Sequence, residues 1–127
     1  MNSIIMGFDF GMKRIGVAVG QKVTQTASGL TVVQACDGIP KWEQLDKLIL
    51  DWQPEKFIVG LPLNMDGSKS EMSQKANKFS RRVSSRYDIP SEMFDERLTS
   101  FEAREYEEKT HIDAIAARLI LESWLRE

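Results

Sequence analysis

The stretch FDFGMKRIGVAV, residues 8–19, sets the pattern for the whole chain. The segment Met1 to Phe10 is largely apolar and predicts a β-strand, and Ile15 to Val19 predicts a second one. Gly11 lies between them and permits the tight reversal of a hairpin. Asp9 interrupts the most apolar part of the first strand, where an ionised carboxylate is disfavoured unless water, a partner group or a cation compensates it.

Outward from this hairpin, Ala27 to Ala35 predicts a third strand, so that the chain begins with a three-stranded antiparallel meander. The period then changes, because Trp42, Leu45, Leu48, Ile49 and Trp52 recur at helical spacing. We expect a helix from Pro40 to Trp52, with Pro40 in its first turn and Pro54 ending it. The short apolar run Phe57 to Leu61 predicts a strand that is buried on both faces of a parallel sheet.

The second half of the chain continues this alternation of helix and strand. Ser68-x-x-Glu71 has the form of a capping box and predicts a helix that runs to Tyr87. Ile89 to Phe94 predicts the last strand, and Thr99-x-x-Glu102 predicts the cap of a third helix. An apolar stripe from Ile112 to Trp124 predicts the closing helix.

The predicted order β-β-β-α-β-α-β-α is typical of the RNase H-like fold. The fold class is therefore α/β, with a mixed five-stranded sheet, a three-stranded antiparallel meander plus parallel strands, flanked by helices. A chain of 127 residues with 42% hydrophobic and 28% charged residues suits one globular domain over residues 1–127. We expect a cytoplasmic protein without membrane contact, because the longest early apolar stretch is too short to span a bilayer. The single Cys36 has no partner for a disulfide.

The distribution of charge bears on the partners of the protein. A net charge of −2 and a pI near 5.5 argue against a protein whose whole surface binds nucleic acid by neutralising phosphates. The positive charge gathers in two places, however, and the predicted second helix is the most basic element. A local basic face is therefore predicted from Lys13, Arg14, Lys69, Lys75, Lys78, Arg81, Arg82 and Arg86.

Four acidic residues stand at the ends of predicted elements. Alone, each has an ordinary explanation: Asp9 turns the chain, Asp95 and Glu96 pair with Arg97, and Asp113 interacts with a helix dipole. In this fold, however, the end of the first strand, the end of the last strand and the start of the closing helix converge. Two carboxylates ~4 Å apart repel by about 4 kcal/mol at an effective dielectric constant of ~20, and a divalent cation relieves this repulsion.

Such a cluster predicts chemistry on a nucleic acid. Oxygen ligands suit Mg²⁺ or Mn²⁺, and two such ions support hydrolysis of a phosphodiester bond. Lys13, Arg14, Asn64 and Arg97 are predicted to bind the substrate, Asn64 because it belongs to a loop that precedes a capped helix. His111, the only histidine, is a weaker candidate for proton transfer.

The sequence also resembles the YqgF family of Holliday-junction-resolvase-like proteins, and the resemblance runs almost from end to end. It is carried by residues 8–19, by VGLPLNMDGS at 59–68, by DERLTS at 95–100, and by IDAIAA at 112–117 with SWL at 123–125. The resemblance implies a nuclease that processes the 5′ end of the precursor of 16S rRNA, with ribosomal particles as a further partner. It implies a catalytic and metal-binding set of Asp9, Glu96 and Asp113, with Asp95 as the alternative to Glu96.

One departure from the family pattern concerns substrate binding. The family usually has a longer loop rich in glycine and lysine before the last acid, whereas here Glu107 to His111 bridges directly. This departure and the acidic pI leave open a non-catalytic module that binds RNA or the ribosome. Two further alternatives also stay open: a nuclease of branched DNA, because backbone hydrolysis needs no base-specific groups, and a nucleotide-binding domain related to actin-like ATPases, because Asp9–Phe10–Gly11 resembles their phosphate loop. The last needs two such domains, and this chain has room for one. The oligomeric state, monomer or homodimer, also stays open.

Overall fold

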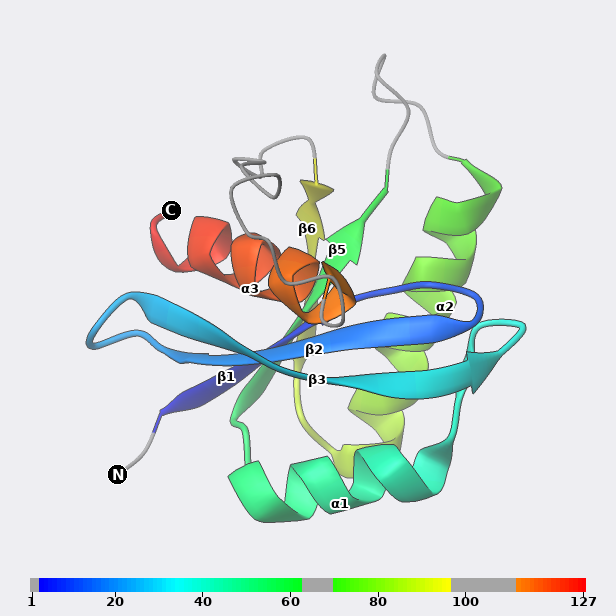
Figure 1. Ribbon diagram of the computed structural model, residues 1–127, viewed down its shortest axis with the longest axis horizontal. Helices are drawn as coiled ribbons and strands as arrows, with labels where there is room; N and C mark the ends of the chain where they lie inside the picture. The colour runs from blue at the N-terminus through cyan, green and yellow to red at the C-terminus, as the bar shows by residue number, and fades with distance from the viewer. Residues whose placement is uncertain (1–2, 63–69, 97–111) are drawn as a thin grey trace.

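A computed structural model describes residues 3–62, 70–96 and 112–127 of the chain (Figure 1). Strands and helices alternate after an initial set of strands, in the predicted order. The strands are β1 (Ile4–Asp9), β2 (Arg14–Gln21), β3 (Thr26–Cys36), β4 (Ile39–Pro40), β5 (Lys56–Leu61) and β6 (Ser91–Asp95); the helices are α1 (Trp42–Trp52), α2 (Glu71–Tyr87) and α3 (Ile112–Leu125).

The sheet confirms the predicted mixture of antiparallel and parallel strands. Its order is β4-β3-β2-β1-β5-β6. The meander pairs β1 with β2 and β2 with β3 in antiparallel fashion, and β1–β5 and β5–β6 are parallel. The two-residue strand β4, which pairs with the end of β3, adds a sixth strand to the five that were expected.

The prediction that Pro40 opens the first helix was wrong. Pro40 belongs to β4 and pairs with Ala35 of β3, and the N–H of Lys41 donates to the Gln34 carbonyl at 2.8 Å. Proline is tolerated on this edge strand because it does not need a ladder donor there. Helix α1 therefore begins at Trp42, and it ends at Trp52 as predicted, with Gln53 in the left-handed conformation.

The predicted cap of the second helix was also misplaced. Helix α2 begins at Glu71, and its N-cap is Ser70. The Ser70 hydroxyl accepts from the N–H of Ser73 at 3.1 Å, and the Ser73 hydroxyl accepts from the N–H of Ser70 at 2.9 Å. The capping box is therefore formed by Ser70 and Ser73, not by the predicted pair Ser68 and Glu71. Ser68 lies outside the described residues. The cap predicted at Thr99 also lies outside them.

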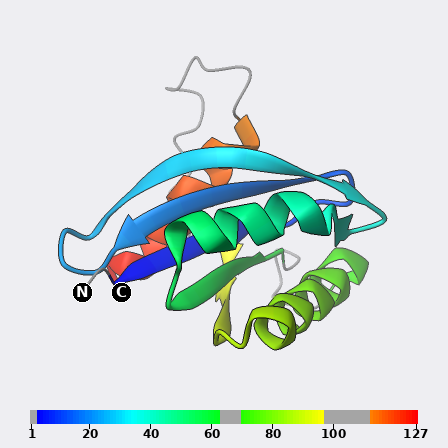
Figure 2. The ribbon, with the colours of Figure 1, turned by 90° about the horizontal axis from the view of Figure 1, so that it is seen from below.

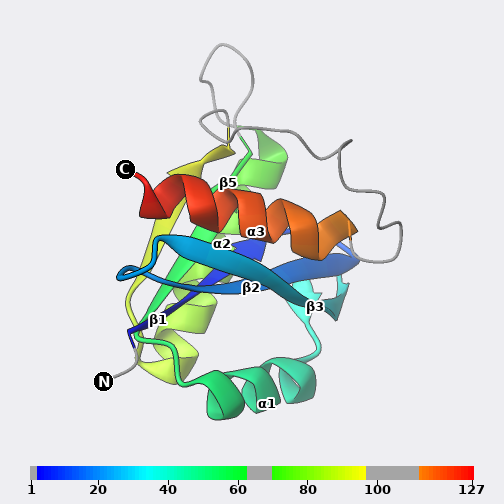
Figure 3. The same ribbon diagram turned by 60° about the vertical axis from the view of Figure 1, so that its left-hand side comes forward.

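Two hydrophobic cores cover the two faces of the sheet. Helices α1 and α2, both visible in Figure 2, pack on one face through Leu45, Ala76, Phe79 and Val83. Helix α3 lies across the other face (Figure 3), where Ala117, Ile120 and Leu121 are buried among others. Among the helices of the described residues, none has the length and apolar composition that a membrane crossing requires.

Helix α3 lies unusually close to the strands beneath it. A Cβ built on Gly7 would lie 2.9 Å from Leu121 Cβ, and one built on Gly29 would lie 3.0 Å from the Ala114 carbonyl oxygen. Side chains of normal size at these positions would hold the helix away from the sheet. The glycines of the strands therefore set how close α3 lies to the sheet.

Candidate active site at the carboxyl end of β1

Asp9 is the last residue of β1, at the edge where the parallel strands β1, β5 and β6 all end. Its neighbours Phe8 and Phe10 are buried in the core beneath α2, and both rings contact Phe79, at centroid distances of 5.3 and 5.4 Å. Side chains alternate along a strand, so Asp9 faces the side of α3, as Gly7 does. The two phenylalanines thus fix the strand end that carries the carboxylate.

Gly16 brings Asp113 to this carboxylate. It pairs directly with Asp9 across β1 and β2. A Cβ on Gly16 would lie only 1.9 Å from the Asp113 carbonyl oxygen and 2.4 Å from its carbonyl carbon, so no other residue fits here without moving the helix. Asp113 belongs to the first turn of α3. The absence of a side chain at position 16 is therefore what lets the third predicted acid approach Asp9.

Gly60 makes room for Glu96 on the opposite side of Asp9. It follows Val59, which pairs with Phe8 in the parallel β1–β5 ladder. A Cβ on Gly60 would lie 2.7 Å from Ile120 Cδ1 of α3, 3.0 Å from Glu96 Cγ and 3.1 Å from the Glu96 carboxyl carbon. Glu96 directly follows β6, so its side chain reaches back over β5 toward Asp9. Two glycines thus flank Asp9, and each admits one of the other two acids.

The electrostatics of Asp9 reflect this arrangement. Burial, reinforced by the negative charges of Glu96 and then Asp113, raises the pKa of Asp9 from 3.8 to about 7. Burial and the neighbouring Asp95 also raise the pKa of Glu96 above its usual value. The charges that act on Asp9 are therefore those of Glu96 and Asp113, which favours Glu96 over Asp95 as its partner in the site.

The two predicted basic residues have different surroundings. Lys13 is exposed, in the turn between β1 and β2. Arg14 begins β2, and its Nε donates to the Asp113 carboxylate at 3.0 Å, so the cation predicted to hold phosphate here neutralises an acid of the site. The Arg14 side chain is still 61% exposed, and its guanidinium keeps further donors for an anion. Asn64, Arg97 and His111 lie outside the described residues.

The chemistry of the donor set fits a hard divalent cation. Asp9, Glu96 and Asp113 offer only carboxylate oxygens, which are the ligands that Mg²⁺ and Mn²⁺ prefer. In the described ranges, no three acidic, histidine or cysteine side chains lie close enough together to hold an ion, and Asp113 is bonded to Arg14. Burial first, and then the charges of Glu96 and Asp113, raise the pKa of Asp9, and a bound cation would favour its ionised form.

Sequence reasoning did not assign a role to Gly16 or Gly60. Both lie in the motifs that carry the family resemblance, at 8–19 and 59–68. The available signal was a glycine inside each of two apolar strands, a feature that often marks close approach of another backbone. What approaches cannot be read from that signal, because Asp113 and Glu96 are remote in the sequence.

Comparison with solved structures identifies the class of this fold. The chain superposes on Thermus thermophilus RuvC in complex with a Holliday junction substrate with a TM-score of 0.56 at 16% identity, covering 97% of this chain and 94% of RuvC. The fowlpox virus Holliday junction resolvase gives a TM-score of 0.56 at 16% identity, with 97% and 98% covered. The protein therefore has the RNase H-like fold of these resolvases.

Sequence comparison then gives the family. The model of the RuvX family, described as "Holliday junction resolvase", matches residues 3–127, and the chain belongs to this family. A protein of Saccharophagus degradans is 51% identical, with 97% of this chain and 93% of that protein covered. One of Glaesserella parasuis is 47% identical, with 100% of this chain and 99% of that protein covered. Both carry the description "Putative pre-16S rRNA nuclease".

Proposed function

We propose that this chain is a divalent-metal-dependent endonuclease that hydrolyses phosphodiester bonds to process the 5′ end of precursor 16S rRNA. The observation that carries the proposal is the buried Asp9 with Glu96 and Asp113 on its two sides, each admitted by a glycine. Full-length relatives at 51% and 47% identity described as nucleases of this precursor support the choice of substrate. The proposal places the activity in one domain over residues 1–127, in the cytoplasm, on free precursor or on ribosomal particles.

The residues of the site would divide the work as follows. Asp9, Glu96 and Asp113 would hold Mg²⁺ or Mn²⁺, which when bound activates water and stabilises charge on a phosphate. Phe8 and Phe10 keep the Asp9 carboxylate in a fixed position through their packing. Arg14 and Lys13 present positive charge at the same strand ends, where they attract the phosphate chain and orient it. Arg14 also balances Asp113 before the substrate arrives.

The first test is cleavage of a precursor 16S rRNA fragment in Mg²⁺ and in Mn²⁺, with a chelator as the blank. We expect wild type to cut the fragment only with a divalent cation, and Asp9→Asn to remain folded and not to cut it. Equal cleavage by Asp9→Asn would overturn the proposed site. Absence of cleavage by both proteins would favour a module that binds RNA without cleaving it. The short segment before Asp113 in the sequence supports the same alternative.

A second function, cleavage of branched DNA, is favoured by the description of the family model and by the RuvC structure with its junction. A four-way DNA junction incubated beside the RNA fragment separates the two. Cleavage of the junction in preference to the RNA would replace the proposed substrate while leaving the acidic site in place, because hydrolysis of either backbone needs the same carboxylates.

The choice between Asp95 and Glu96 gives a separate prediction. Of the two acids, Glu96 is the one that raises the pKa of Asp9, together with Asp113, and the one that lies near the position of a Cβ on Gly60. We expect Glu96→Gln to lower the cleavage rate by about 10²-fold or more, as loss of a ligand or charge at a metal site does, and Asp95→Asn to keep most of it. Single-turnover rates at saturating Mg²⁺ measure both. A larger loss of cleavage rate in Asp95→Asn than in Glu96→Gln would make Asp95, and not Glu96, the metal ligand.

A further inference from the structure

Helix α2 is strongly basic, although none of its residues belongs to the acidic site. Between Glu71 and Tyr87 it has five lysines or arginines and one glutamate, a net charge of +4, in a chain whose net charge is −2. Its buried face packs on the sheet through Ala76, Phe79 and Val83. The cations are thus concentrated on the surface of one helix, outside the core.

A concave surface collects most of these cations between α2 and the start of α1. This basic groove has a volume of about 580 Å³, and no acidic side chain lines it. Four of its six residues are cationic. The lining residues are Trp42, Lys78, Arg81, Arg82, Ser85 and Arg86.

Arg86 is held in place at one end of the basic groove. Its Nε and Nη2 donate to the two carboxylate oxygens of Asp46 at 3.0 and 2.9 Å. Its guanidinium also stacks 4.6 Å from the ring centroid of Trp42. A planar cation that is fixed in this way loses little conformational entropy when it binds a phosphate.

The other three cations of the basic groove repel one another. Lys78, Arg81 and Arg82 have no ion pair or hydrogen bond in the part of the chain that the structure describes. The spacings 78–81 and 78–82 place like charges on neighbouring positions of the helix, which destabilises it by about 0.2–0.5 kcal/mol for each pair. An anionic ligand that neutralises the three charges would remove this repulsion.

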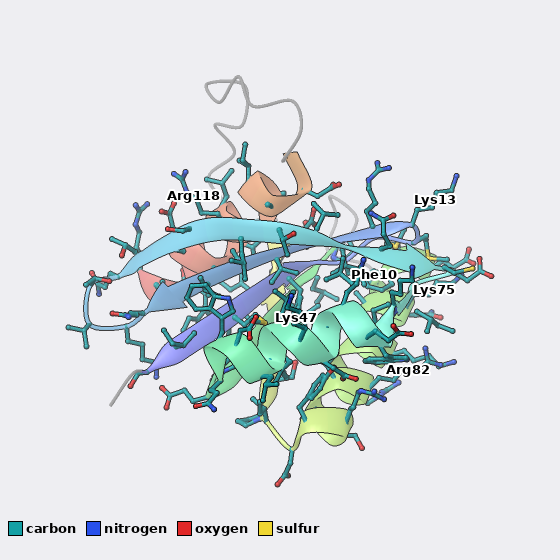
Figure 4. All side chains as sticks on the ribbon, turned by 60° about the horizontal axis from the view of Figure 1, so that its bottom comes forward. Phe10, Lys13, Lys47, Lys75, Arg82 and Arg118 are labelled. Carbon is teal, nitrogen blue, oxygen red and sulfur yellow. The ribbon has the colours of Figure 1, made fainter. Side chains whose placement is uncertain are left out.

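A separate hollow lies at the beginning of α2, and it is lined by both charges of the Lys75–Glu71 pair, whose Nζ and Oε1 are 3.9 Å apart. This hollow, of about 410 Å³, joins Met12 of the β1–β2 turn to the beginning of α2. In Figure 4 the labelled Lys75 lies between Lys13 and Arg82, and Lys47 of α1 lies apart from them. At 1.5 Å per residue, Lys75 and Arg86 are separated by roughly 16 Å along the helix. The cations of α2 thus extend along the helix from Lys75, near its start, to Arg86, in its last turn.

We propose that the basic groove binds the phosphate backbone of single-stranded RNA on one side of the cleavage point. This inference rests on the proposed function for its choice of RNA. Lys78, Arg81 and Arg82 neutralise successive phosphates, and Arg86, supported by Trp42 and Asp46, adds a fixed donor. The contacts are to phosphate, so binding does not depend on base sequence. The basic groove thereby supplies positive charge for RNA binding that relatives with a longer, lysine-rich loop before the last acid have in that loop.

The test measures binding without cleavage. Fluorescence anisotropy of a labelled single-stranded RNA of about 12 nucleotides, in a chelator, gives the Kd of wild type at several salt concentrations. The combined variant Lys78→Gln, Arg81→Gln and Arg82→Gln is compared with a matched control, Lys22→Gln, Lys47→Gln and Arg126→Gln. The control removes the same charge at exposed positions that do not line the basic groove. Urea unfolding confirms that both variants are folded.

We expect the groove variant to bind at least about tenfold more weakly than wild type at ~0.1 M salt. Its slope of log K against log salt should fall in magnitude by about 2, since each phosphate contact on a single strand contributes ~0.7. The control should differ from wild type by less than about threefold. Equal losses in the two variants, or no RNA binding by wild type, would overturn the proposal and leave an anionic protein as the partner to test.

The two proposals can fail separately. Loss of binding in the groove variant supports the basic groove even where wild type cleaves no RNA, and in that case the proposed function alone fails. Metal-dependent cleavage by wild type with equal RNA affinity in both variants keeps the proposed function and overturns the basic groove.

Discussion

Asp9→Asn should make the metal-free protein more stable at about pH 8 while lowering cleavage by about 10³-fold or more. The folded state raises the pKa of Asp9 from 3.8 to about 7, because burial and the charges of Glu96 and Asp113 oppose ionisation. An ionised Asp9 therefore destabilises the folded state at about pH 8 by about 2 to 4 kcal/mol. Asparagine keeps the shape of the side chain and cannot ionise, so the variant avoids this penalty.

The pH dependence has a definite sign. The folded state binds the Asp9 proton more tightly than the unfolded chain does, so the stabilising contribution of this group is complete below pH 3.8. It is lost as the pH rises through about 7. Wild type should therefore lose stability relative to Asp9→Asn between about pH 4 and pH 8, and the advantage of the variant should nearly vanish at the acid end. Urea unfolding across this range, in a chelator, measures the difference.

Asp46→Asn is a control for which we expect the opposite change in stability, because the pKa of Asp46 is shifted in the opposite direction to that of Asp9. The pKa of Asp46 lies below its usual value, because Arg86 and Tyr87 donate hydrogen bonds to its carboxylate. Its contribution is present above the unfolded pKa and is lost as the pH falls through the lower folded value, so Asp46→Asn should lower stability near neutral pH. An Asp9→Asn protein no more stable than wild type at about pH 8 would contradict the account of a charged, buried acid cluster.

Gly16→Ala should damage both the stability and the activity of the protein. The new Cβ would lie 1.9 Å from the Asp113 carbonyl oxygen, a distance that only movement of the α3 start can relieve. We expect a loss of about 3 kcal/mol in the free energy of unfolding, at the upper end for overpacking by one methyl group. Because Asp113 moves with the helix, cleavage should fall by about 10²-fold, the cost of a misplacement of ~1 Å.

Gly29→Ala provides the matched comparison for this prediction. It adds the same methyl group under the same helix, but its nearest neighbour, the Ala114 carbonyl oxygen, is 3.0 Å away, so a small adjustment relieves the contact. We expect a loss of less than about 1.5 kcal/mol and nearly full cleavage. Urea unfolding and single-turnover cleavage, both in conditions where each variant is folded, measure the pair. Full cleavage by a stable Gly16→Ala protein would refute the role given to Gly16.

The elements that the sequence predicted well are those whose signal is local. Ile15 to Val19 lies within β2, and Phe57 to Leu61 reproduces β5 to within one residue, because hydrophobic runs bounded by turns are typical of strands. Pro40 and Ser68 were misassigned for a common reason. A proline suits both an edge strand and a first helical turn, and two serines two residues apart both suit an N-cap. The pairing of β4 with β3 and the bonds between Ser70 and Ser73 decide these positions in the structure.

The sequence by itself determined the class of fold, the family resemblance and the acids that form the candidate site. Only the tertiary structure decided where Glu96 and Asp113 lie relative to Asp9, which cation meets Asp113, and that α2 and the start of α1 border a basic groove. Arg14 and Asp113 are 99 residues apart and yet 3.0 Å from each other. Periodicity and capping patterns report on neighbours within a few residues, whereas Gly16 and Gly60 act through the space they leave for distant parts of the chain. That space exists only once α3 packs on the sheet.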